Sequence, residues 1–571
     1  MTLQRIDPAL VDALRAIAKS RGFSLNARDE SGYVALTRNA QASVEFLLNL
    51  PDYNDPRLVP PVDNQGRAYS RPKASENPLN AWSHKTNITA SVPADGLGLL
   101  MGRTIAIKDN MRVAGVPLTD GTQPFHLSED KPYPIPQLDA TIVSRVLDAG
   151  ATITGTSTCE NYCMSAMSCT SATGPVQNPW LSGYTSGGSS SGNAALLAIH
   201  AVQRWREERN LPPANHLGEG VDLALGADQG GSIRLPAAYC GVYGLKPTLG
   251  LVPYTGIEGL HPLCDHAGPM ASSVRDTALL LSVIAGYDGF DPRMTPESPL
   301  RERVPQYHAL LDAEIAARTV AETWSPTSAA KGLRVGILQE SFDIPNLDPE
   351  VASIIRTAAS RFAELGGIVE EVSIPQHAYA PHTFSAAVGL HAADTFLNPA
   401  PSALSYPFST AAPSQNQHWY DNLTASNPQA VHIFLTGLYL QDRQRCPESV
   451  RAKVLSHVHE LRAAYDEALA RFDVLITPAN PTPGVKHAEQ GLGVKDKADF
   501  LLSNTLNTCP FNVSGHPALV IPVGWGAVKG EEDARLPVGM QIVGRRWGEE
   551  TLFLAAAAWE VLGKGLDGVR T

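Results

Sequence analysis

Two short runs of glycine and serine stand out because such runs bring backbone amides and hydroxyls close to a reacting group. The first spans residues 186–192, Ser-Gly-Gly-Ser-Ser-Ser-Gly, and leads directly into an Ala/Leu stretch typical of a buried helix. A phosphate cradle, a nucleophile elbow of the G-x-S-x-G type with Ser190 as nucleophile, and a flexible linker are its three interpretations. A P-loop would need a following Gly-Lys-Ser/Thr, which the run lacks, and a linker does not normally precede an apolar helix directly.

The second run, Asp228-Gln229-Gly230-Gly231-Ser232, follows an apolar segment typical of a buried strand. Two glycines before a serine let the backbone approach a substrate and direct several N–H groups at one oxygen. This is the geometry of an oxyanion hole, which stabilises the negative oxygen formed when a carbonyl is attacked. Taken alone, the run is also compatible with an ordinary turn that exposes a serine.

A lysine at the end of an apolar segment is the third piece. Lys108 follows Ala106 and Ile107, although lysine generally avoids burial. Lysines at strand ends commonly keep the ammonium group in water, which is the structural interpretation. Burial favours the neutral form of a lysine, and a neutral lysine can activate a serine nucleophile in place of a Ser–His–Asp triad.

An α/β fold with a mostly parallel or mixed sheet would position these three pieces. From about residue 97, short apolar segments typical of strands alternate with longer segments of helical periodicity. The pattern predicts helices at 140–149 and 350–365. It predicts strands at Thr104–Ile107, Thr152–Gly155, Leu223–Gly226, Leu333–Leu338, Ile368–Ile374 and Phe472–Thr477.

The first 80 residues are predicted to form a separate helical domain. Asp7-Pro8 is a good helix start, an apolar stripe follows, and Gly22 can end the helix. A second helical pattern covers residues 44–48, and the prolines between 51 and 81 indicate an extended strap. Residues 81–571 form the predicted main domain, with a charged insertion near 203–218 expected to be a surface loop.

Composition excludes several function classes. The 571 residues carry 45 Lys and Arg against 57 Asp and Glu, a formal net charge of −12, which argues against a nucleic-acid partner. The first 24 residues do not match a signal peptide and no apolar run approaches a membrane span, so we expect no membrane association and a cytoplasmic location. Seven cysteines are too few for a disulfide scaffold. Cys159, Cys163 and Cys169 match no common zinc spacing, so we expect no metal site and small core residues there.

Taken together, these motifs resemble the amidase signature family over about residues 97–565. The matching segments are 106–110, 174–180, 187–192, 226–241, 244–248, 512–517 and 536–541. The N-terminal helical domain, with residues 75–82, is most similar to nitrile-pathway amidases that carry such a domain. The resemblance implies an amidase signature fold, in which a large mixed β-sheet core is covered by helices. It also implies a small N-terminal α-helical domain at 1–80 before a catalytic domain at 81–571.

The resemblance also implies a Ser–cisSer–Lys triad. Ser232 would be the acylating nucleophile, Ser189 would follow a cis peptide bond and bridge the two partners, and Lys108 would be the base. The oxyanion hole would be formed by the backbone N–H groups of Gln229, Gly230, Gly231 and Ser232. Ser190 would then be a supporting hydroxyl and not the nucleophile.

Three further residues have two interpretations each. Asp228 either orients the oxyanion turn or takes part in catalysis, and Arg234 either pairs with an acidic group or touches substrate. Met164 either lines the acyl pocket or belongs to the core. Ser189 and Ser232 lie 43 positions apart, further than family members usually place them, and the charged insertion accounts for the difference.

The implied activity is hydrolysis of a small-molecule amide to an acid and ammonia or an amine through a Ser232 acyl-enzyme, without cofactor or metal. A homodimer through the N-terminal helices is an open option. Two enzymatic alternatives remain: a protein like the transamidating subunit of a tRNA-dependent amidotransferase, and a serine esterase that uses Ser190. A non-catalytic interaction protein on the same fold is the third.

Overall fold

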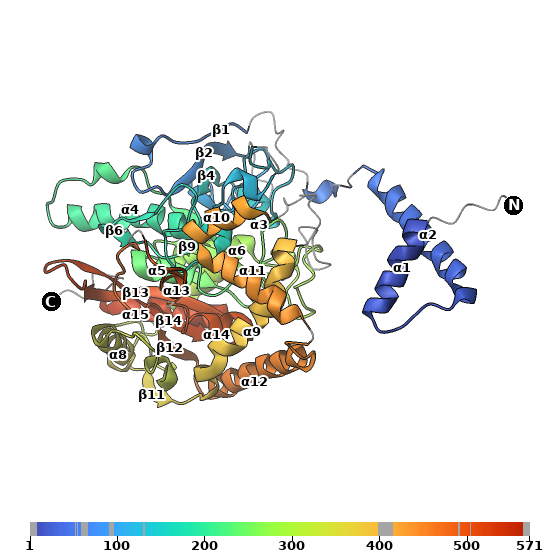
Figure 1. Ribbon diagram of the computed structural model, residues 1–571. Coiled ribbons are helices and arrows are strands. Elements are labelled where there is room, and N and C mark those ends of the chain that lie inside the picture. Colours follow the sequence, from blue (N-terminus) through green and yellow to red (C-terminus); the bar gives the residue numbers. More distant parts are fainter. Residues whose placement is uncertain are drawn as a thin grey trace. The chain divides into compact units, whose positions relative to one another are not determined.

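The structure is a computed structural model (Figure 1). It describes residues 8–51, 53, 55–58, 67–90, 96, 98–128, 132–397, 415–442, 444–488, 491–502 and 504–563. The chain divides into two compact units between Arg57 and Leu58. Each unit is described by itself.

The N-terminal unit contains two helices, α1 (Pro8–Ser20) and α2 (Ala27–Leu48). Helix α1 begins at Pro8, and Gly22 follows it with φ +82°, as the sequence predicts. Helix α2 is much longer than the pattern at 44–48 indicated. It buries only Val34, so it carries no apolar stripe from which its length could be read.

A mixed sheet of twelve strands, counted over the described residues, forms the centre of the larger unit. Strands β3, β4 and β7 are parallel to one another, and so are β10, β11 and β12, whereas the other pairs are antiparallel. In spatial order the strands are β1 (Tyr69–Ser70), β2 (Trp82–Thr89), β4 (Thr152–Ser157), β3 (Thr104–Lys108), β7 (Leu223–Asp228), β9 (His266–Ala271), β8 (Tyr243–Lys246), β13 (Ala518–Ala527), β14 (Arg535–Gly544), β12 (Val474–Pro478), β10 (Arg334–Leu338) and β11 (Ile368–Val372). A separate ribbon pairs β5 (Gln177–Asn178) with β6 (Leu181–Thr185).

Side chains of β3 alternate between two apolar cores, as the period of two in a strand requires. Ile105 and Ile107 join a large core with helices on one face, whereas Ala106 joins a second core on the other face. The sheet is therefore covered on both faces, and the predicted α/β class with a mixed sheet is confirmed. The first core contains α3 (Thr141–Asp148), α6 (Val274–Ile284), α7 (Tyr307–Val320), α8 (Pro349–Glu364) and α15 (Glu549–Trp559); the second contains α4 (Ser191–Glu207) and α5 (Arg234–Cys240).

A third core packs helices against the strands at the β12–β14 side of the sheet (Figure 1). Its helices are α9 (Gln376–Leu397), α12 (Ser449–Arg471) and α14 (Cys509–Ser514). The remaining helices are α10 (Gln417–Ser426), α11 (Pro428–Gln441) and α13 (Val494–Leu502). Among the described helices, none combines the length and the apolar character that a bilayer span needs.

The predicted strands and helices of the main domain are all present, with ends that differ by a few residues. The charged stretch 203–218 was expected to be a surface loop, and this is wrong for its first part. Helix α4 continues through Glu207 before the chain turns. The physical reason is that Gln, Arg and Glu are good helix formers, so their charge marks an exposed helical end and not a break.

Candidate active site

Lys108 is the last residue of β3 and is fully buried. Its Nζ donates to Ser189 Oγ at 2.8 Å and to the carbonyl oxygen of Ala227 at 3.2 Å. Because β3 pairs in parallel with β7, the end of β7 lies next to Lys108. The structure therefore brings together two of the pieces that the sequence singled out, at the carboxyl ends of neighbouring parallel strands.

Ser189 stands in the turn between β6 and α4 and is fully buried. The peptide bond from Gly188 to Ser189 is cis. A Cβ atom on Gly188 would lie 2.5 Å from the carbonyl oxygen of Ser165, so only glycine fits at this point. The close packing holds the turn against its neighbours and presents the Ser189 hydroxyl to Lys108.

Ser232 follows β7 in the glycine turn and is 8% exposed. The N–H of Ser190 donates to the carbonyl oxygen of Ser232 at 3.1 Å, which joins the two serine-bearing turns directly. The backbone N–H groups of Gln229, Gly230 and Ser232 donate to no acceptor among the described residues. These three N–H groups are therefore available to an acceptor from outside the protein.

Gly231 differs from its neighbours, because its N–H donates to Asp228 Oδ1 at 2.8 Å. In this conformation it supports the turn instead of facing a substrate. Gly231 has φ +143°, and a Cβ there would lie 2.4 Å from Thr508 Oγ1. Thr508 in turn donates to the carbonyl oxygen of Gly230 at 2.6 Å. A residue from a distant segment thus fixes the shape of the turn.

Asp228 and Arg234 form a buried ion pair beneath the turn, with neither side chain exposed. Arg234 Nη2 donates to Asp228 Oδ1 at 2.9 Å, and Nη1 donates to Gln541 Oε1 at 2.7 Å. Burial opposes ionisation of Asp228, but the Arg234 guanidinium and its hydrogen bonds outweigh burial and hold its pKa well below the usual value. The carboxylate also accepts from Ile233 N–H, so in the structure both residues shape the turn.

Ser190 and Met164 are two further residues that the sequence singled out. Ser190 is fully buried and its hydroxyl donates to the carbonyl oxygen of Ala227 at 3.3 Å. Met164 packs in a small apolar cluster with Trp419 and Leu423. Ser190 therefore contacts the same carbonyl as Lys108, and Met164 belongs to a packed group in this structure.

Two buried carboxyls near Lys108 and Ser189 have no counterpart in the sequence-based predictions. Burial raises the pKa of Glu160 to about 7, although it accepts hydrogen bonds from Thr170 and Ser191. Burial likewise raises the pKa of Asp109, the residue after Lys108, to about 7. No sequence pattern indicated these two carboxyls, because an acidic residue next to a strand end is usually exposed to solvent. Only the packing of the folded chain buries them.

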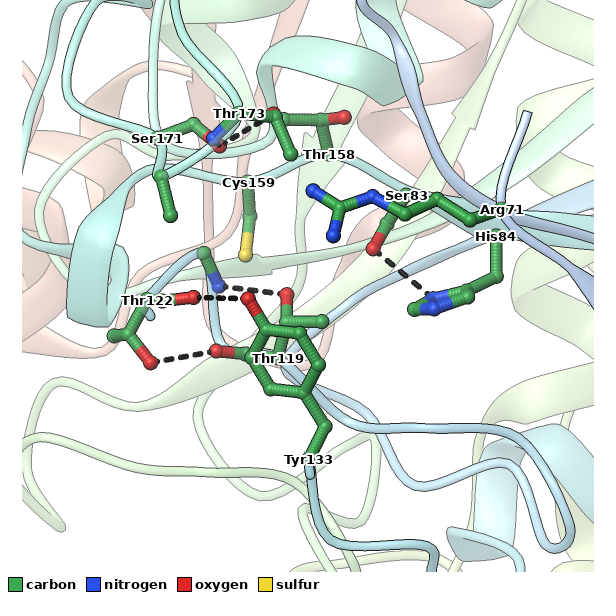
Figure 2. Close-up of a pocket in the computed structure, with 12 residues that line it drawn as sticks. Arg71, Ser83, His84, Thr119, Thr122, Tyr133, Thr158, Cys159, Ser171 and Thr173 are labelled. Carbon is green, nitrogen blue, oxygen red and sulfur yellow. Dashed lines mark hydrogen bonds between the residues drawn. The ribbon is translucent and has the colours of Figure 1, made fainter. Parts of the chain in front are cut away.

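A pocket lined mainly by polar residues lies beside these groups (Figure 2). Thr119, which lines it, donates to Asp109 Oδ2 at 2.5 Å. Cys159 also lines the pocket. A residue of the pocket wall therefore contacts Asp109, which follows Lys108. No pattern in the sequence indicated this pocket.

A family model described as Amidase matches residues 74–204 and 218–553. The chain belongs to the amidase family. The break in the match, between 204 and 218, falls in the charged stretch that the sequence marked as an insertion. The resemblance to amidases is thereby confirmed, and with it the expectation of an enzyme that hydrolyses amide bonds.

Named relatives agree with this assignment. An enantioselective amidase of Rhodococcus rhodochrous is 38% identical over 503 residues, which cover 86% of this amidase and 85% of that protein. A glutamyl-tRNA(Gln) amidotransferase subunit of Picosynechococcus sp. is 31% identical over 502 residues, with 84% and 88% covered. The solved peptide amidase of Stenotrophomonas maltophilia superposes with a TM-score of 0.58 at 25% identity, covering 81% of this chain and 82% of that one.

Proposed function

We propose that this amidase cleaves small-molecule amides through an acyl-enzyme on Ser232, with Ser189 and Lys108 as proton relay. The observation that carries the proposal is the hydrogen bond from Lys108 Nζ to Ser189 Oγ inside a fully buried site. The bond between the Ser190 amide and the Ser232 carbonyl adds support, because it keeps the nucleophile's turn beside Ser189.

The chemistry follows from these positions. The substrate carbonyl oxygen accepts from the N–H groups of Gln229, Gly230 and Ser232 while the Ser232 hydroxyl attacks the carbonyl carbon. The proton of Ser232 passes to Ser189, whose own proton passes to the amine of Lys108. The same relay then protonates the amide nitrogen, and ammonia or an amine leaves. Water then attacks the acyl carbon and gives a proton to the relay. The bond between that carbon and Ser232 Oγ breaks, the relay returns a proton to Ser232, and the acid leaves.

A transamidating role is the second candidate, because the glutamyl-tRNA(Gln) amidotransferase subunit of Picosynechococcus sp. is also similar to this chain. The stand-alone role is favoured by the higher identity to the Rhodococcus amidase. The esterase alternative would make Ser190 the nucleophile. It is disfavoured because the Ser190 hydroxyl is fully buried and donates to a backbone carbonyl.

The remaining assignments complete the proposal. Met164 would border the acyl group, since it directly follows Cys163, which contacts Ser189. All seven cysteines are free thiols, which fits a reducing compartment such as the cytoplasm. A homodimer through α1 and α2 stays a prediction that a light-scattering mass would test.

The experiment is hydrolysis by the purified chain alone. Acetamide, benzamide, anilides and amino-acid amides are offered without ATP or other proteins, and ammonia or amine release is measured. Turnover of any of these, lost in Lys108→Ala by about 10²–10⁴-fold in kcat, supports the proposal. Activity only after addition of partner proteins and ATP would favour the transamidating role.

A further inference from the structure

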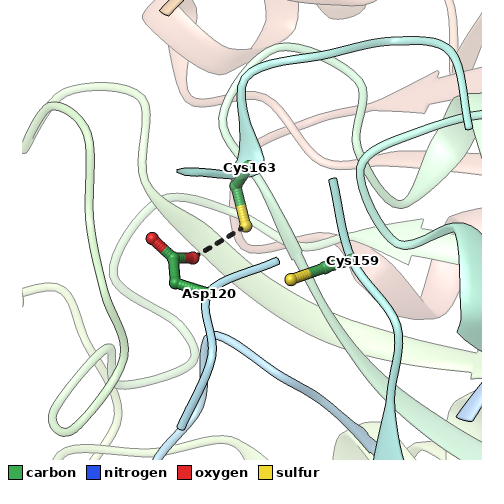
Figure 3. Close-up of side chains that lie close together, drawn as sticks. All are labelled: Asp120, Cys159 and Cys163. Carbon is green, nitrogen blue, oxygen red and sulfur yellow. Dashed lines mark hydrogen bonds between the residues drawn. The ribbon is translucent and has the colours of Figure 1, made fainter. Parts of the chain in front are cut away.

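Two thiols and a carboxylate form a cluster (Figure 3). One of the thiols, Cys163, forms a hydrogen bond with Ser189. Asp120, Cys159 and Cys163 each offer one ligand atom, and these three atoms all lie within 4.8 Å of one another. The Cys163 thiol donates to Asp120 Oδ1 at 3.5 Å. Cysteine spacing indicated no metal site because the third member, Asp120, lies 39 positions before Cys159 and reaches the cluster only through the fold.

The ligand set suits a borderline or soft divalent cation. Zinc and cadmium prefer thiolates and accept carboxylates. In a tetrahedral site with Zn–S bonds of about 2.3 Å, two sulfurs stand about 3.8 Å apart. The two sulfur atoms lie within 4.8 Å of each other, so they would need to approach by no more than about 1 Å to bind one zinc ion. Three protein ligands leave the fourth position to a water molecule.

A metal ion binds cysteine as the thiolate and aspartate as the carboxylate, so ion binding displaces the protons of these groups. Burial in the protein disfavours the ionised forms. The positive charge of the bound ion offsets that cost for the two thiols and the carboxyl group.

The cluster borders a pocket on the Cys159 side (Figure 2). Cys159 and Gly121, the neighbour of Asp120, line this pocket. Arg71, another lining residue, is exposed to solvent.

We propose that Asp120, Cys159 and Cys163 form an inhibitory binding site for a divalent cation such as Zn²⁺ or Cd²⁺. The ion takes no part in hydrolysis. It engages the Cys163 sulfur that the Ser189 hydroxyl contacts, and its charge opposes the positive charge that Lys108 acquires during proton transfer. Inhibition rests on the proposed function, whereas binding does not.

Binding is tested first, without reference to activity. The full chain, reduced and freed of metal by a chelator, is titrated with Cd²⁺ while the thiolate-to-cadmium charge-transfer absorption and the bound ion in equilibrium dialysis are followed. We expect one ion per chain and the absorption of two thiolates. Cys163→Ser and Cys159→Ala should each weaken binding at least about tenfold, since even outer partners of a metal site contribute that much.

The matched control is Cys169→Ala. Cys169 is half-buried like Cys163 but lies outside the cluster, so this variant should bind Cd²⁺ as the unaltered chain does. No binding by the unaltered chain, or equal affinity in Cys163→Ser, would overturn the site. If Cys159→Ala fails to fold, Cys163→Ser decides alone. Mg²⁺ in excess should not displace Cd²⁺, because it prefers oxygen ligands.

Inhibition is tested second, in amide hydrolysis. Zn²⁺ should slow the unaltered chain and the Cys169→Ala control alike, and a chelator should restore the rate. In Cys163→Ser the concentration for half inhibition should rise at least about tenfold. Binding without inhibition would overturn the inhibitory role. A chain that binds Cd²⁺ but hydrolyses no amide would count against the proposed function and not against the site.

Discussion

Replacing Gly231 by alanine should separate the shape of the oxyanion turn from the stability of the fold. The new Cβ would stand 2.4 Å from Thr508 Oγ1, whereas real Cβ atoms essentially never come closer than 3.0 Å and ordinary contact begins at 3.4 Å. The turn and Thr508 must therefore move apart by 0.6 to 1.0 Å. Because Thr508 holds the Gly230 carbonyl, the shift moves the amides that we propose to face the substrate.

The size of the effect follows from that displacement. A misplacement of about 1 Å can reduce a rate about 100-fold, which agrees with the loss of one oxyanion donor. We expect kcat of Gly231→Ala to fall about 100-fold, about 2.7 kcal/mol in the barrier, with a smaller change in KM. The strained φ of +143° should also reduce the free energy of unfolding by about 1–3 kcal/mol.

Gly183→Ala is the matched control. Gly183 has φ +85°, and no atom lies within 4 Å of where its Cβ would be. The Gly183→Ala substitution therefore introduces backbone strain without a steric clash. This variant should have a lower free energy of unfolding and an unchanged kcat. Steady-state kinetics on an amide that the unaltered enzyme hydrolyses, with urea unfolding of each variant, decide the matter. A kcat for Gly231→Ala within threefold of that for Gly183→Ala would refute the reasoning.

Three other predictions concern buried groups around the turn. Arg234→Met leaves Asp228 buried without its guanidinium, so urea unfolding should show a loss of about 3–5 kcal/mol; a loss below about 1 kcal/mol would contradict the role of the pair. Ser189→Ala should lower kcat far more than Ser190→Ala, because the Ser189 hydroxyl contacts Lys108 whereas that of Ser190 donates to a backbone carbonyl; the reverse order would favour the esterase alternative. Glu160 stays protonated in the fold up to about pH 7 but ionises near 4.5 when unfolded. Between these pH values the folded chain binds more protons than the unfolded chain, so the free energy of unfolding falls as pH rises. Glu160→Gln should reduce this pH dependence between about pH 4.5 and 7. An unchanged slope would contradict the assignment to Glu160.

The parts of the site that follow from sequence are those with local signals. Lys108 ends an apolar strand, and the two glycine–serine runs stand next to apolar segments, so each piece was recognisable before the fold was known. Their assembly depends on the parallel pairing of β3 with β7. Alternation of strand and helix segments predicts that kind of pairing, which is why the fold class and the six strands of the parallel pairs were predicted. The antiparallel strands β13 and β14 and the long helices α9 and α12 were not.

The other parts depend on contacts between distant segments that carry no motif. Thr508 lies 277 positions after Gly231, and nothing in its neighbourhood indicates that it supports the turn. Asp120 meets Cys163 only because the loops after β3 and β4 face each other. Only residues 44–48 of helix α2 were predicted to be helical, for a different reason: the helix buries a single residue, and periodicity indicates a helix only when one of its faces is buried.

Covalent labelling of Ser232 tests the central claim most directly. The purified chain is treated with a fluorophosphonate, and the modified peptide is identified by mass spectrometry. We expect one adduct on Ser232, absent from Ser232→Ala, retained in Ser190→Ala and much slower to form in Lys108→Ala. An adduct on Ser190, or labelling of Ser232→Ala at the rate of the unaltered chain, would contradict the assignment of Ser232 as the nucleophile.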